Sequence, residues 1–346
     1  MNDPNRPKSR LRALHLAATV AVLFSACNAP SANDCARPDL FCVGFVTAFG
    51  TIDDHGLNQS AWEGVRQAVT ERFVDRADFI ETVDARDRAK NIASFAGAGY
   101  DLIVTIGYSI GEDTRLAADD WPDTRFLGVD QPQTESRPNL AAITFPEDQG
   151  GFLAGVIAAS ATKTGRVAAV CEVRDIPEMW RACEGFRAGV HYASADALPR
   201  VVFHPDHNPD NWFNDPVWGA EQASINARIG MDVLFAAGGN SALGALDAAT
   251  EEGLYIIGTD EDVLYQVKTP DRVIASVVKD VRSIVYTLTL AASQGQLPGG
   301  DFGGAYALAE GPGFARLILP SLQGRIEQIQ RGLSDGSIQT NVPREP

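Results

Sequence analysis

Short apolar runs alternate with amphipathic segments along most of the chain, and this alternation predicts its secondary structure. In the first half, buried strands are predicted at residues 42–47, 79–83, 102–106, 126–129 and 141–145. The segments between them carry apolar residues at helical spacing and predict helices at residues 60–73, 89–98 and 112–119. In the first of these helices, Trp62, Val65, Val69 and Phe73 form one apolar face, which we expect to pack on a core.

The same alternation repeats in the second half of the chain. Strands are predicted at residues 167–171, 201–204, 233–236, 255–258 and 273–278. Helices are predicted at residues 148–161, 179–194, 216–229, 242–252, 280–293 and 317–333. Alternation of this kind is typical of parallel sheets that helices cover on both faces. Two such runs predict an α/β fold with two doubly wound parallel-sheet lobes.

The N-terminal segment differs in composition from the rest of the chain. Basic residues precede an apolar stretch, residues 13–26, which is too short to span a bilayer. This pattern predicts a secretory signal peptide at residues 1–26. The three residues before Cys27 resemble the end of the cleavage box of bacterial lipoproteins. We therefore expect a lipid on Cys27 and a linker at residues 27–39, with an ordinary secreted protein as the alternative.

The formal net charge of -16 narrows the range of partners. The predicted signal peptide is net basic, so the exported chain is more acidic still. A surface of this kind argues against nucleic acid or anionic lipid headgroups as partners. It fits a domain that stands off a membrane on a lipid anchor, and we expect a monomer.

Four cysteines remain after the expected lipid site: Cys35, Cys42, Cys171 and Cys183. An even number of cysteines in an exported protein indicates disulfides. Several pairings are possible, and we favour Cys35–Cys42 and Cys171–Cys183 because each closes a short local loop. Zinc is the competing interpretation, but no CxxC pair or suitable histidine spacing supports it. We expect neither a metal nor a cofactor.

Polar residues follow several predicted strands at the point where each strand ends. Open α/β sheets bind ligands at the carboxyl ends of their strands, next to helix N-termini. In two facing lobes we expect these residues to meet in one cleft and bind the hydroxyl groups of a sugar. The candidates are Asn58, Asp130, Gly238, Asp260 and Lys279, and we expect Asp54 and Leu57, from the same loop as Asn58, to line the cleft too. The alternative is that each polar residue is only a helix cap or a surface charge.

An aromatic residue adds a second kind of contact. Phe213 lies just before a predicted helix, with Trp212 and Trp218 on either side of it. An exposed aromatic ring at this place can stack on a flat ring of a ligand. The alternative for each of these residues is packing in a core.

The chain also contains a motif of serine hydrolases. Residues 107–111, GYSIG, match G-x-S-x-G, and they follow a predicted strand and precede a helix. Ser109 would be the nucleophile, with His191, His204 or His207 as the base. A glycine-rich turn after a strand is common in doubly wound folds, so the match to this motif is weak evidence for a hydrolase. We therefore expect the protein not to be an enzyme.

Five segments resemble, in order, the successive signatures of the basic membrane protein family. They are IDDHGLNQSAWEG, FPEDQGGFLAGVIAA, CEGFRAGVHYA, IIGTDED and VIASVVKD, and the resemblance continues to the terminal SDGSIQTNVP. Members of this family are substrate-binding lipoproteins of ABC importers, and well-described members bind purine nucleosides. The resemblance implies a type I periplasmic-binding-protein fold, in which three crossings join two lobes and closure buries the ligand.

On this basis, we expect residues 40–145 and 274–300 to form lobe 1. Residues 146–273 and 301–346 are then expected to form lobe 2. The hinge crossings are expected near residues 144–147 and 274–277.

The resemblance also implies roles for individual residues. Asp260 and Lys279 match groups on the ribose side of the family's pocket, and Asn58 and the Gly238 turn lie nearby. Phe213 matches one of two aromatic residues that stack on the base. The half of the pocket that binds the sugar is therefore expected to be retained.

The other half departs from the family's pattern. Leu57 stands where the second stacking aromatic is found, and Ala48 stands where an acid contacts the base. We therefore expect an extracytoplasmic, membrane-anchored binding protein for a nucleoside or a similar polar ring-bearing solute, with an ABC permease as its partner. A ligand-sensing lipoprotein that reports to a membrane receptor is the alternative.

Overall fold

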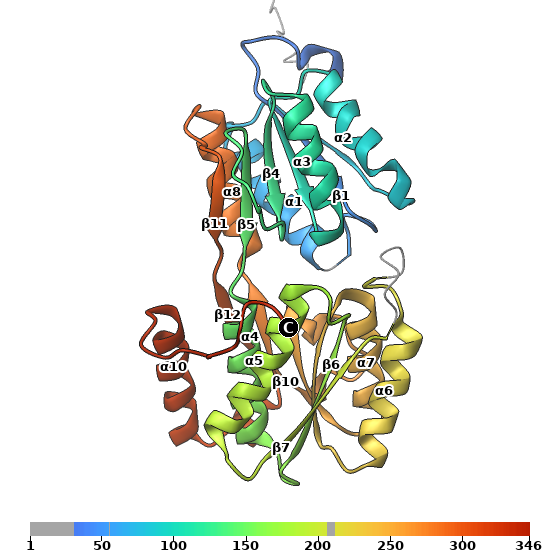
Figure 1. Ribbon diagram of the computed structural model, residues 1–346, viewed down its shortest axis with the longest axis vertical. Coiled ribbons are helices and arrows are strands. Elements are labelled where there is room, and N and C mark those ends of the chain that lie inside the picture. The colour runs from blue at the N-terminus through green and yellow to red at the C-terminus, as the bar shows by residue number, and fades with distance from the viewer. Residues whose placement is uncertain (1–30, 55, 206–211) are drawn as a thin grey trace, which may run out of the picture.

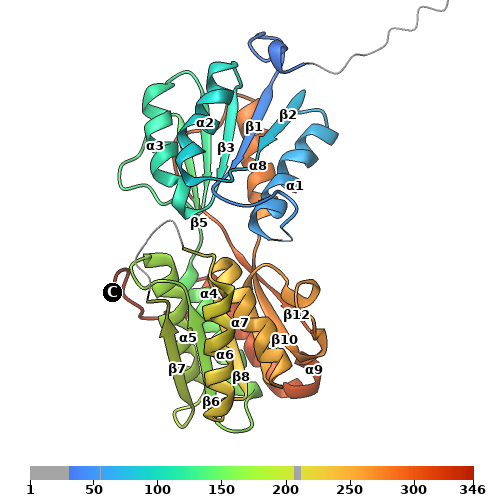
Figure 2. The ribbon, with the colours of Figure 1, turned by 90° about the vertical axis from the view of Figure 1, so that its right-hand side faces the viewer.

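The computed structural model describes residues 31–54, 56–205 and 212–346, which form two six-stranded sheets (Figure 1). The predicted signal peptide, Cys27 and His207 lie outside the described residues. The two sheets lie one above the other along the long axis of the molecule, and connecting segments run between them (Figures 1 and 2). This arrangement confirms the predicted α/β fold with two lobes.

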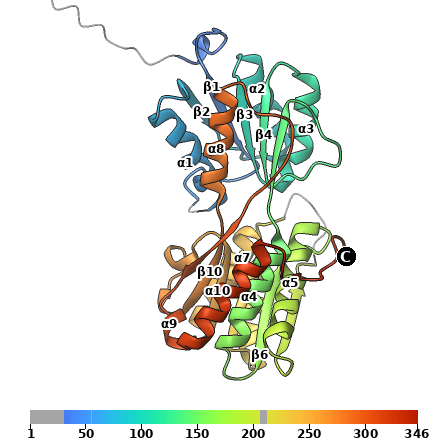
Figure 3. The ribbon, with the colours of Figure 1, turned by 90° about the vertical axis from the view of Figure 1, so that its left-hand side faces the viewer.

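The first sheet has the strand order β11–β5–β4–β3–β1–β2, with parallel neighbours throughout. Its strands are β1 (Cys42–Thr47), β2 (Arg76–Ile80), β3 (Leu102–Ile106), β4 (Arg125–Val129), β5 (Leu140–Thr144) and β11 (Gly300–Gly303). One face is covered by α1 (Leu57–Thr70) and α8 (Val281–Ser293), and the other by α2 (Arg88–Gly97) and α3 (Gly111–Asp120) (Figures 2 and 3). Alternate side chains of β1 explain this, because Phe45 packs with α1 and α8 whereas Val46 packs with α2 and α3.

The second sheet has the order β12–β10–β9–β8–β6–β7, and only its edge strand β12 is antiparallel. Its strands are β6 (Arg166–Cys171), β7 (Leu198–Phe203), β8 (Val233–Ala237), β9 (Tyr255–Asp260), β10 (Val273–Lys279) and β12 (Tyr306–Glu310). One face carries α4 (Glu147–Ala161), α5 (Pro177–Ala193) and α10 (Pro320–Ser334), and the other α6 (Pro216–Arg228) and α7 (Gly239–Glu251) (Figures 2 and 3). The short helix α9 (Phe314–Leu317) precedes α10.

Most predicted strands and helices are present with boundaries shifted by a few residues. Two strands, β11 and β12, have no counterpart in the prediction. Their sequences, GDFG and YALAE, are too short and contain too few large apolar residues to show a clear apolar periodicity. Short 3-10 helices lie at Ala32–Asp34, Ala85–Asp87, Tyr108–Ile110, Val263–Tyr265 and Pro270–Arg272.

The expected lobe boundary at residue 274 is wrong. Strand β10 pairs with β9 and β12 and is the second strand of the second sheet. Its side chains are buried on both faces, because Val273 belongs to the core beside α6 and α7 while Val277 belongs to the core beside α4. The chain therefore crosses between the sheets after Lys279, not at residues 274–277. Because β11 joins the first sheet, the last crossing follows Gly303.

Two disulfides tie strand ends to neighbouring segments. Cys35 is bonded to Cys42, seven residues away, at the start of β1. Cys171, the last residue of β6, is bonded to Cys183 of α5, twelve residues away. Both disulfides are the pairings predicted from the sequence, each of which closes a short loop. Within the described residues, no helix combines the length and the apolarity that a membrane crossing requires.

Candidate functional site

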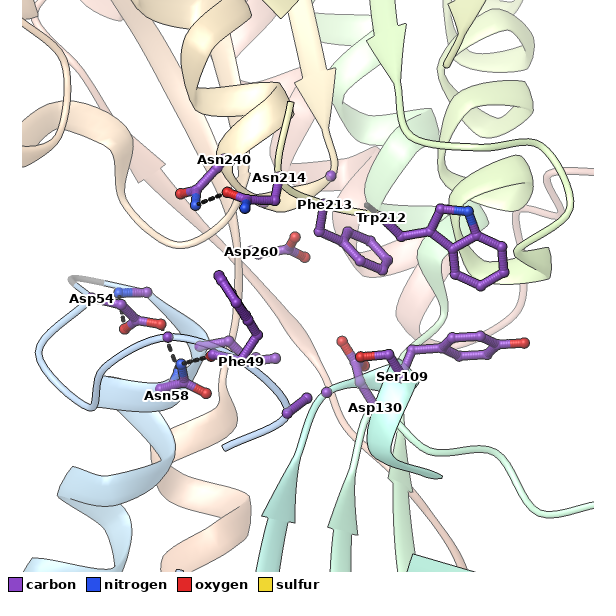
Figure 4. A pocket seen from close by; sticks show the side chains of 18 of the residues that line it. Phe49, Asp54, Asn58, Ser109, Asp130, Trp212, Phe213, Asn214, Asn240 and Asp260 are labelled. Carbon is purple, nitrogen blue, oxygen red and sulfur yellow. Dashed lines mark hydrogen bonds between the residues drawn. The ribbon is translucent and has the colours of Figure 1, made fainter. Parts of the chain in front are cut away.

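A cleft of about 750 Å³ lies between the two lobes, at the carboxyl ends of their parallel strands. Figure 4 shows side chains entering it from both lobes. The structure brings all eight residues proposed from the sequence to this one cleft: Asp54, Leu57, Asn58, Asp130, Phe213, Gly238, Asp260 and Lys279. The shared position at strand ends is what brings them together.

Lys279 lies at the centre of a cluster of charged side chains that borders the cleft. It is the last residue of β10 and only 2% exposed. Its Nζ lies 2.6 Å from Asp130 Oδ2, 3.2 Å from Asp260 Oδ1 and 3.4 Å from Glu147 Oε1. The ring of Phe145 lies 5.1 Å from the same ammonium group. Lys279 thus joins an acid of the first lobe, Asp130, to an acid of the second, Asp260.

The two aspartates occupy equivalent places in the two lobes. Asp130 follows β4 in the sequence FLGVD, and Asp260 ends β9 in the sequence IIGTD. Both have a left-handed backbone, with φ of 59° and 71°. This conformation is uncommon for residues other than glycine, and aspartate tolerates it better than most. It turns the chain at the strand end, and both carboxylates meet the same lysine.

Burial and charge act against each other in this cluster. Burial alone would lower the pKa of Lys279, but Asp130 and Asp260 raise it well above its usual value. Burial raises the pKa of Asp130, with Lys279 opposing the change. Burial also raises the pKa of Glu147 to about 7, although Lys279 and Arg181 lie near it. The lysine therefore stays charged, while Glu147 is half protonated near neutral pH.

The loop after β1 uses its polar residues partly to hold its own shape. The Asp54 carboxylate accepts hydrogen bonds from the backbone N–H groups of Gly56, Asn58 and Gln59, so it caps α1. Asn58 donates through Nδ2 to the carbonyl oxygens of Phe49 and Thr51. The helix-cap interpretation therefore holds for Asp54. Both residues also border the cleft.

Aromatic side chains from both lobes also line the cleft. Phe213 of the second lobe lines it as predicted, together with Trp212. Phe49, from the loop after β1, enters from the first lobe and is 48% exposed (Figure 4). Sequence reasoning missed Phe49, because TAFG reads as the end of the first strand. Its position directly after Thr47 and Ala48, at a strand end, is the signal that could have identified it.

Several buried polar atoms that border the cleft have no hydrogen-bond partner within the described residues. They are Asp130 Oδ1, Glu178 Oε2, Glu261 Oε1 and Trp212 Nε1. Burial, together with nearby Asp260, raises the pKa of Glu261 to about 9, so this acid is protonated at neutral pH. Glu178 and Glu261 were not predicted as cleft residues. Glu178 lies in the first turn of a helix and Glu261 lies in the run DED, and acids in such positions are usually exposed on the surface. The residues that line the cleft thus carry unpaired carboxyl oxygens and one unpaired N–H donor, that of Trp212.

Of the residues in the hydrolase interpretation, the structure describes Ser109, His191 and His204 but not His207. Ser109 borders the cleft, and its carbonyl oxygen accepts a hydrogen bond from Arg88. His204, one of the proposed bases, is held in the second lobe, with Nε2 3.3 Å from Asp215 Oδ2 and Nδ1 3.8 Å from Glu172 Oε1. His191 is exposed on α5. Within the described part of the chain, no group of three or more acidic, histidine or cysteine side chains is arranged to hold a metal ion.

Comparison with known proteins gives consistent results. Residues 41–303 match the Bmp family model, described as ABC transporter substrate-binding protein PnrA-like. Basic membrane protein A of Borreliella burgdorferi is 32% identical over 67% of this chain and 66% of its own length. The ABC transporter nucleoside-binding protein BmpA of Lactococcus lactis is 27% identical over 74% of this chain and 76% of its own.

Solved structures agree on the fold. An ABC transporter solute-binding protein from Aeropyrum pernix superimposes with a TM-score of 0.74 at 22% identity, over 86% of this chain and 92% of that one. The match of the family model covers most of the chain, including every strand of the first sheet. The chain therefore belongs to the Bmp family of PnrA-like ABC transporter substrate-binding proteins, a family that binds solutes without transforming them.

Proposed function

We propose that this protein is a lipid-anchored, extracytoplasmic receptor that captures a nucleoside, or a similar polar ring-bearing solute, and delivers it to its permease. Membership of the family implies a small-molecule ligand and a permease partner. The observation that carries the finer proposal is that two kinds of side chain line the same cleft: carboxylates around Lys279, and aromatic rings from both lobes. We infer that the two sets bind different parts of the ligand, and we call them the carboxylate end and the aromatic end.

The carboxylate end suits a sugar. Asp130 and Asp260 are held in place by Lys279, and Asp130 Oδ1 remains without a partner. Two adjacent hydroxyl groups can each donate to one of these carboxylates. Hydrogen bonds to a charged group are stronger than those between neutral groups, and here the lysine fixes their direction. Ligand binding at this end would also bridge the lobes, because the two aspartates belong to different sheets.

The aromatic end suits a flat ring. Phe213 and Phe49 belong to opposite lobes, and Leu57 adds an apolar surface beside Phe49. We infer that Phe49 supplies the second ring contact that Leu57 cannot make. Because Ala48 offers no acceptor to a base N–H, this end is expected to select for ring shape more than for ring substituents. The relative in Lactococcus lactis whose name includes nucleoside binding supports a ligand of this class.

The charge of the cleft favours an uncharged solute over a phosphorylated one. Among the described residues that line it, six are acids and three are basic. The acids are Asp54, Asp84, Asp130, Glu178, Asp260 and Glu261, and the basic residues are Arg86, Arg88 and Lys279. Lys279 is already surrounded by carboxylates. A phosphate group would therefore meet net repulsion, and we expect nucleosides to bind better than nucleotides.

Isothermal titration against nucleosides, nucleotides, free bases and free sugars tests this proposal. We expect a nucleoside to bind more tightly than its base or its sugar alone. Asp260→Asn should weaken nucleoside and sugar binding about tenfold or more, because one charged hydrogen bond is lost. The exposed Asp123→Asn serves as the matched control and should bind as the wild type does. Equal affinity of Asp260→Asn and the wild type would contradict the placement of the sugar.

The lipid anchor has its own test. Cys27 is expected to carry the lipid, so the full-length protein should fractionate with membranes after export. Cys27→Ser should be released in soluble form, and mass spectrometry should show no acyl chain on it. Recovery of the wild type as a soluble protein without an acyl chain would refute the anchor and leave the ligand proposal untouched.

A further inference from the structure

The aromatic residue of the second lobe has a backbone conformation that needs support. Phe213 has φ of 65°, in the left-handed region that bulky side chains avoid. Such a conformation persists only where surrounding contacts hold it, and residues held in this way cluster at ligand sites. The backbone of Phe213 must therefore be held in this conformation by its neighbours.

Both polar backbone groups of Phe213 are bonded to fixed partners. Its N–H donates to Glu172 Oε2 at 3.0 Å. Its carbonyl oxygen accepts from the backbone N–H of Asn240 at 2.9 Å. One of these partners is backbone at the start of α7, and the other is a single side chain, Glu172.

Glu172 is itself held firmly. It follows β6, is 1% exposed, and its N–H donates to the Ala237 carbonyl at 2.9 Å. Its Oε1 accepts a second backbone N–H, that of Val173, at 3.3 Å. Gly238 packs against it, since a Cβ at Gly238 would lie 2.6 Å from the Cβ of Glu172. The carboxylate therefore has one orientation, and both of its oxygens accept backbone N–H groups.

We propose that Glu172 is a positioning residue that sets ligand specificity by holding Phe213 in its ring-stacking conformation. This inference rests on the proposed function, because it assigns Glu172 an effect on the ring end of the cleft alone. Glu172 has no place in the sugar end, which is formed around Lys279 by Asp130 and Asp260. A residue that acts through Phe213 should change the affinity for ring-bearing ligands and leave the affinity for a sugar unchanged.

Glu172→Gln is the informative variant. Glutamine has the same size, but only one of its two terminal atoms is an acceptor and it carries no charge. It can therefore satisfy only one of the N–H groups of Phe213 and Val173. We expect affinity for guanosine to fall about tenfold and affinity for ribose to change less than about twofold. Isothermal titration of both ligands measures the difference.

A double-mutant cycle separates positioning from general damage. In a Phe213→Ala background, Glu172→Gln should change guanosine affinity less than about twofold, because the group it positions is gone. Asp232→Asn is the matched control: this carboxylate also accepts backbone N–H groups, from Lys163 and Thr164, at the opposite end of β8. It should lower stability but not the guanosine-to-ribose affinity ratio. An equal loss from Glu172→Gln with and without Phe213 would overturn the proposal.

Hydrogen exchange tests the inference without a ligand. The Phe213 N–H should exchange slowly in the wild type and much faster in Glu172→Gln, with β8 amides unchanged. If guanosine does not bind the wild type, the proposed ligand class fails, and this measurement still decides whether Glu172 holds Phe213. Unchanged exchange at Phe213 would refute the role of Glu172. Loss of guanosine binding in Phe213→Ala, without any effect of Glu172→Gln, would refute it while the proposed function stands.

Discussion

At the scale of single residues, Lys279 has the most costly environment in the cleft. It is almost fully buried, and three carboxylates lie within 3.4 Å of its Nζ. Replacing it with methionine would keep most of its volume and leave those carboxylates without a buried cation. We expect Lys279→Met to lower the free energy of unfolding by about 3–5 kcal/mol at pH 7. Denaturant unfolding measures this loss.

The loss should be smaller at pH 5, because burial raises the pKa of Glu147 to about 7 and this acid is largely neutral at pH 5. Lys268→Met is the control. Lys268 contacts Asp247 and Glu251 but its side chain is 70% exposed, so its replacement should change the free energy of unfolding little. Similar losses in the two variants would contradict the buried cluster.

Glu147 gives the stability of the protein a distinct pH dependence. Its pKa is raised from 4.5 to about 7 by burial, so the folded state binds a proton more tightly than the unfolded state does. Stability from this group is therefore greatest below the unfolded pKa and falls as pH rises toward 7. The total change is on the order of 3 kcal/mol. Unfolding of the wild type and Glu147→Gln at several pH values between 4.5 and 8 should show a shallower slope in the variant.

Phe49 offers a test of the ring end. Phe49→Ala should weaken nucleoside binding by about 0.5–1.5 kcal/mol, because one aromatic contact is lost. Ribose affinity should not change, and titration of both ligands measures this. Phe73→Ala removes a similarly exposed ring that follows α1 and does not line the cleft, and it should bind both ligands as the wild type does. A matching loss of ribose affinity in Phe49→Ala would place the sugar, not the ring, beside Phe49.

At the scale of elements, the sequence predicted the long helices and central strands well, because buried faces impose a periodicity on them. It failed for β11 and β12, which are short and contain few large apolar residues. The same reasoning predicted Asp130, Asp260 and Lys279, because strand ends share one edge. It could not predict Glu172 or Glu178, because which acids become buried depends on how the lobes and loops pack. The assignment of β10 failed because a strand bordering a crossing looks the same in either lobe.

The contact between α4 and α5 is unusually close and depends on glycine. A Cβ at Gly155 of α4 would lie 2.1 Å from the carbonyl oxygen of Phe186 in α5. Gly155→Ala should therefore separate the helices and lower the free energy of unfolding by about 1–3 kcal/mol. Gly324→Ala in α10 is the control, because nothing lies within 4 Å of its added Cβ. That variant should gain about 0.5–1 kcal/mol from helix propensity, and chemical denaturation distinguishes the two outcomes.

At the scale of the whole molecule, neither lobe is a continuous stretch of chain. The first sheet receives α8 and β11 only after the chain has passed through the second sheet, and β12 then returns to the second. All three crossings lie near Lys279, since Phe145, Glu147 and Tyr306 surround it. We therefore expect the two lobes to unfold together.

Hydrogen exchange in the Gly155→Ala variant tests this coupling. Gly155 lies in the second lobe, yet the slowest amides of β3 in the first lobe should lose the same protection free energy as those of β6. Gly324→Ala should leave both sets at least as well protected as in the wild type. A loss confined to β6 would mean that the lobes open independently.

The interleaved course of the chain also bears on how the protein is made. Its first sheet lacks an edge strand and a covering helix until residue 303 has been synthesised, because β11 and α8 come late in the sequence. A nascent chain therefore cannot complete its N-terminal half while the ribosome is still making the C-terminal half. We therefore expect both halves to complete their folding only after most of the chain has been synthesised.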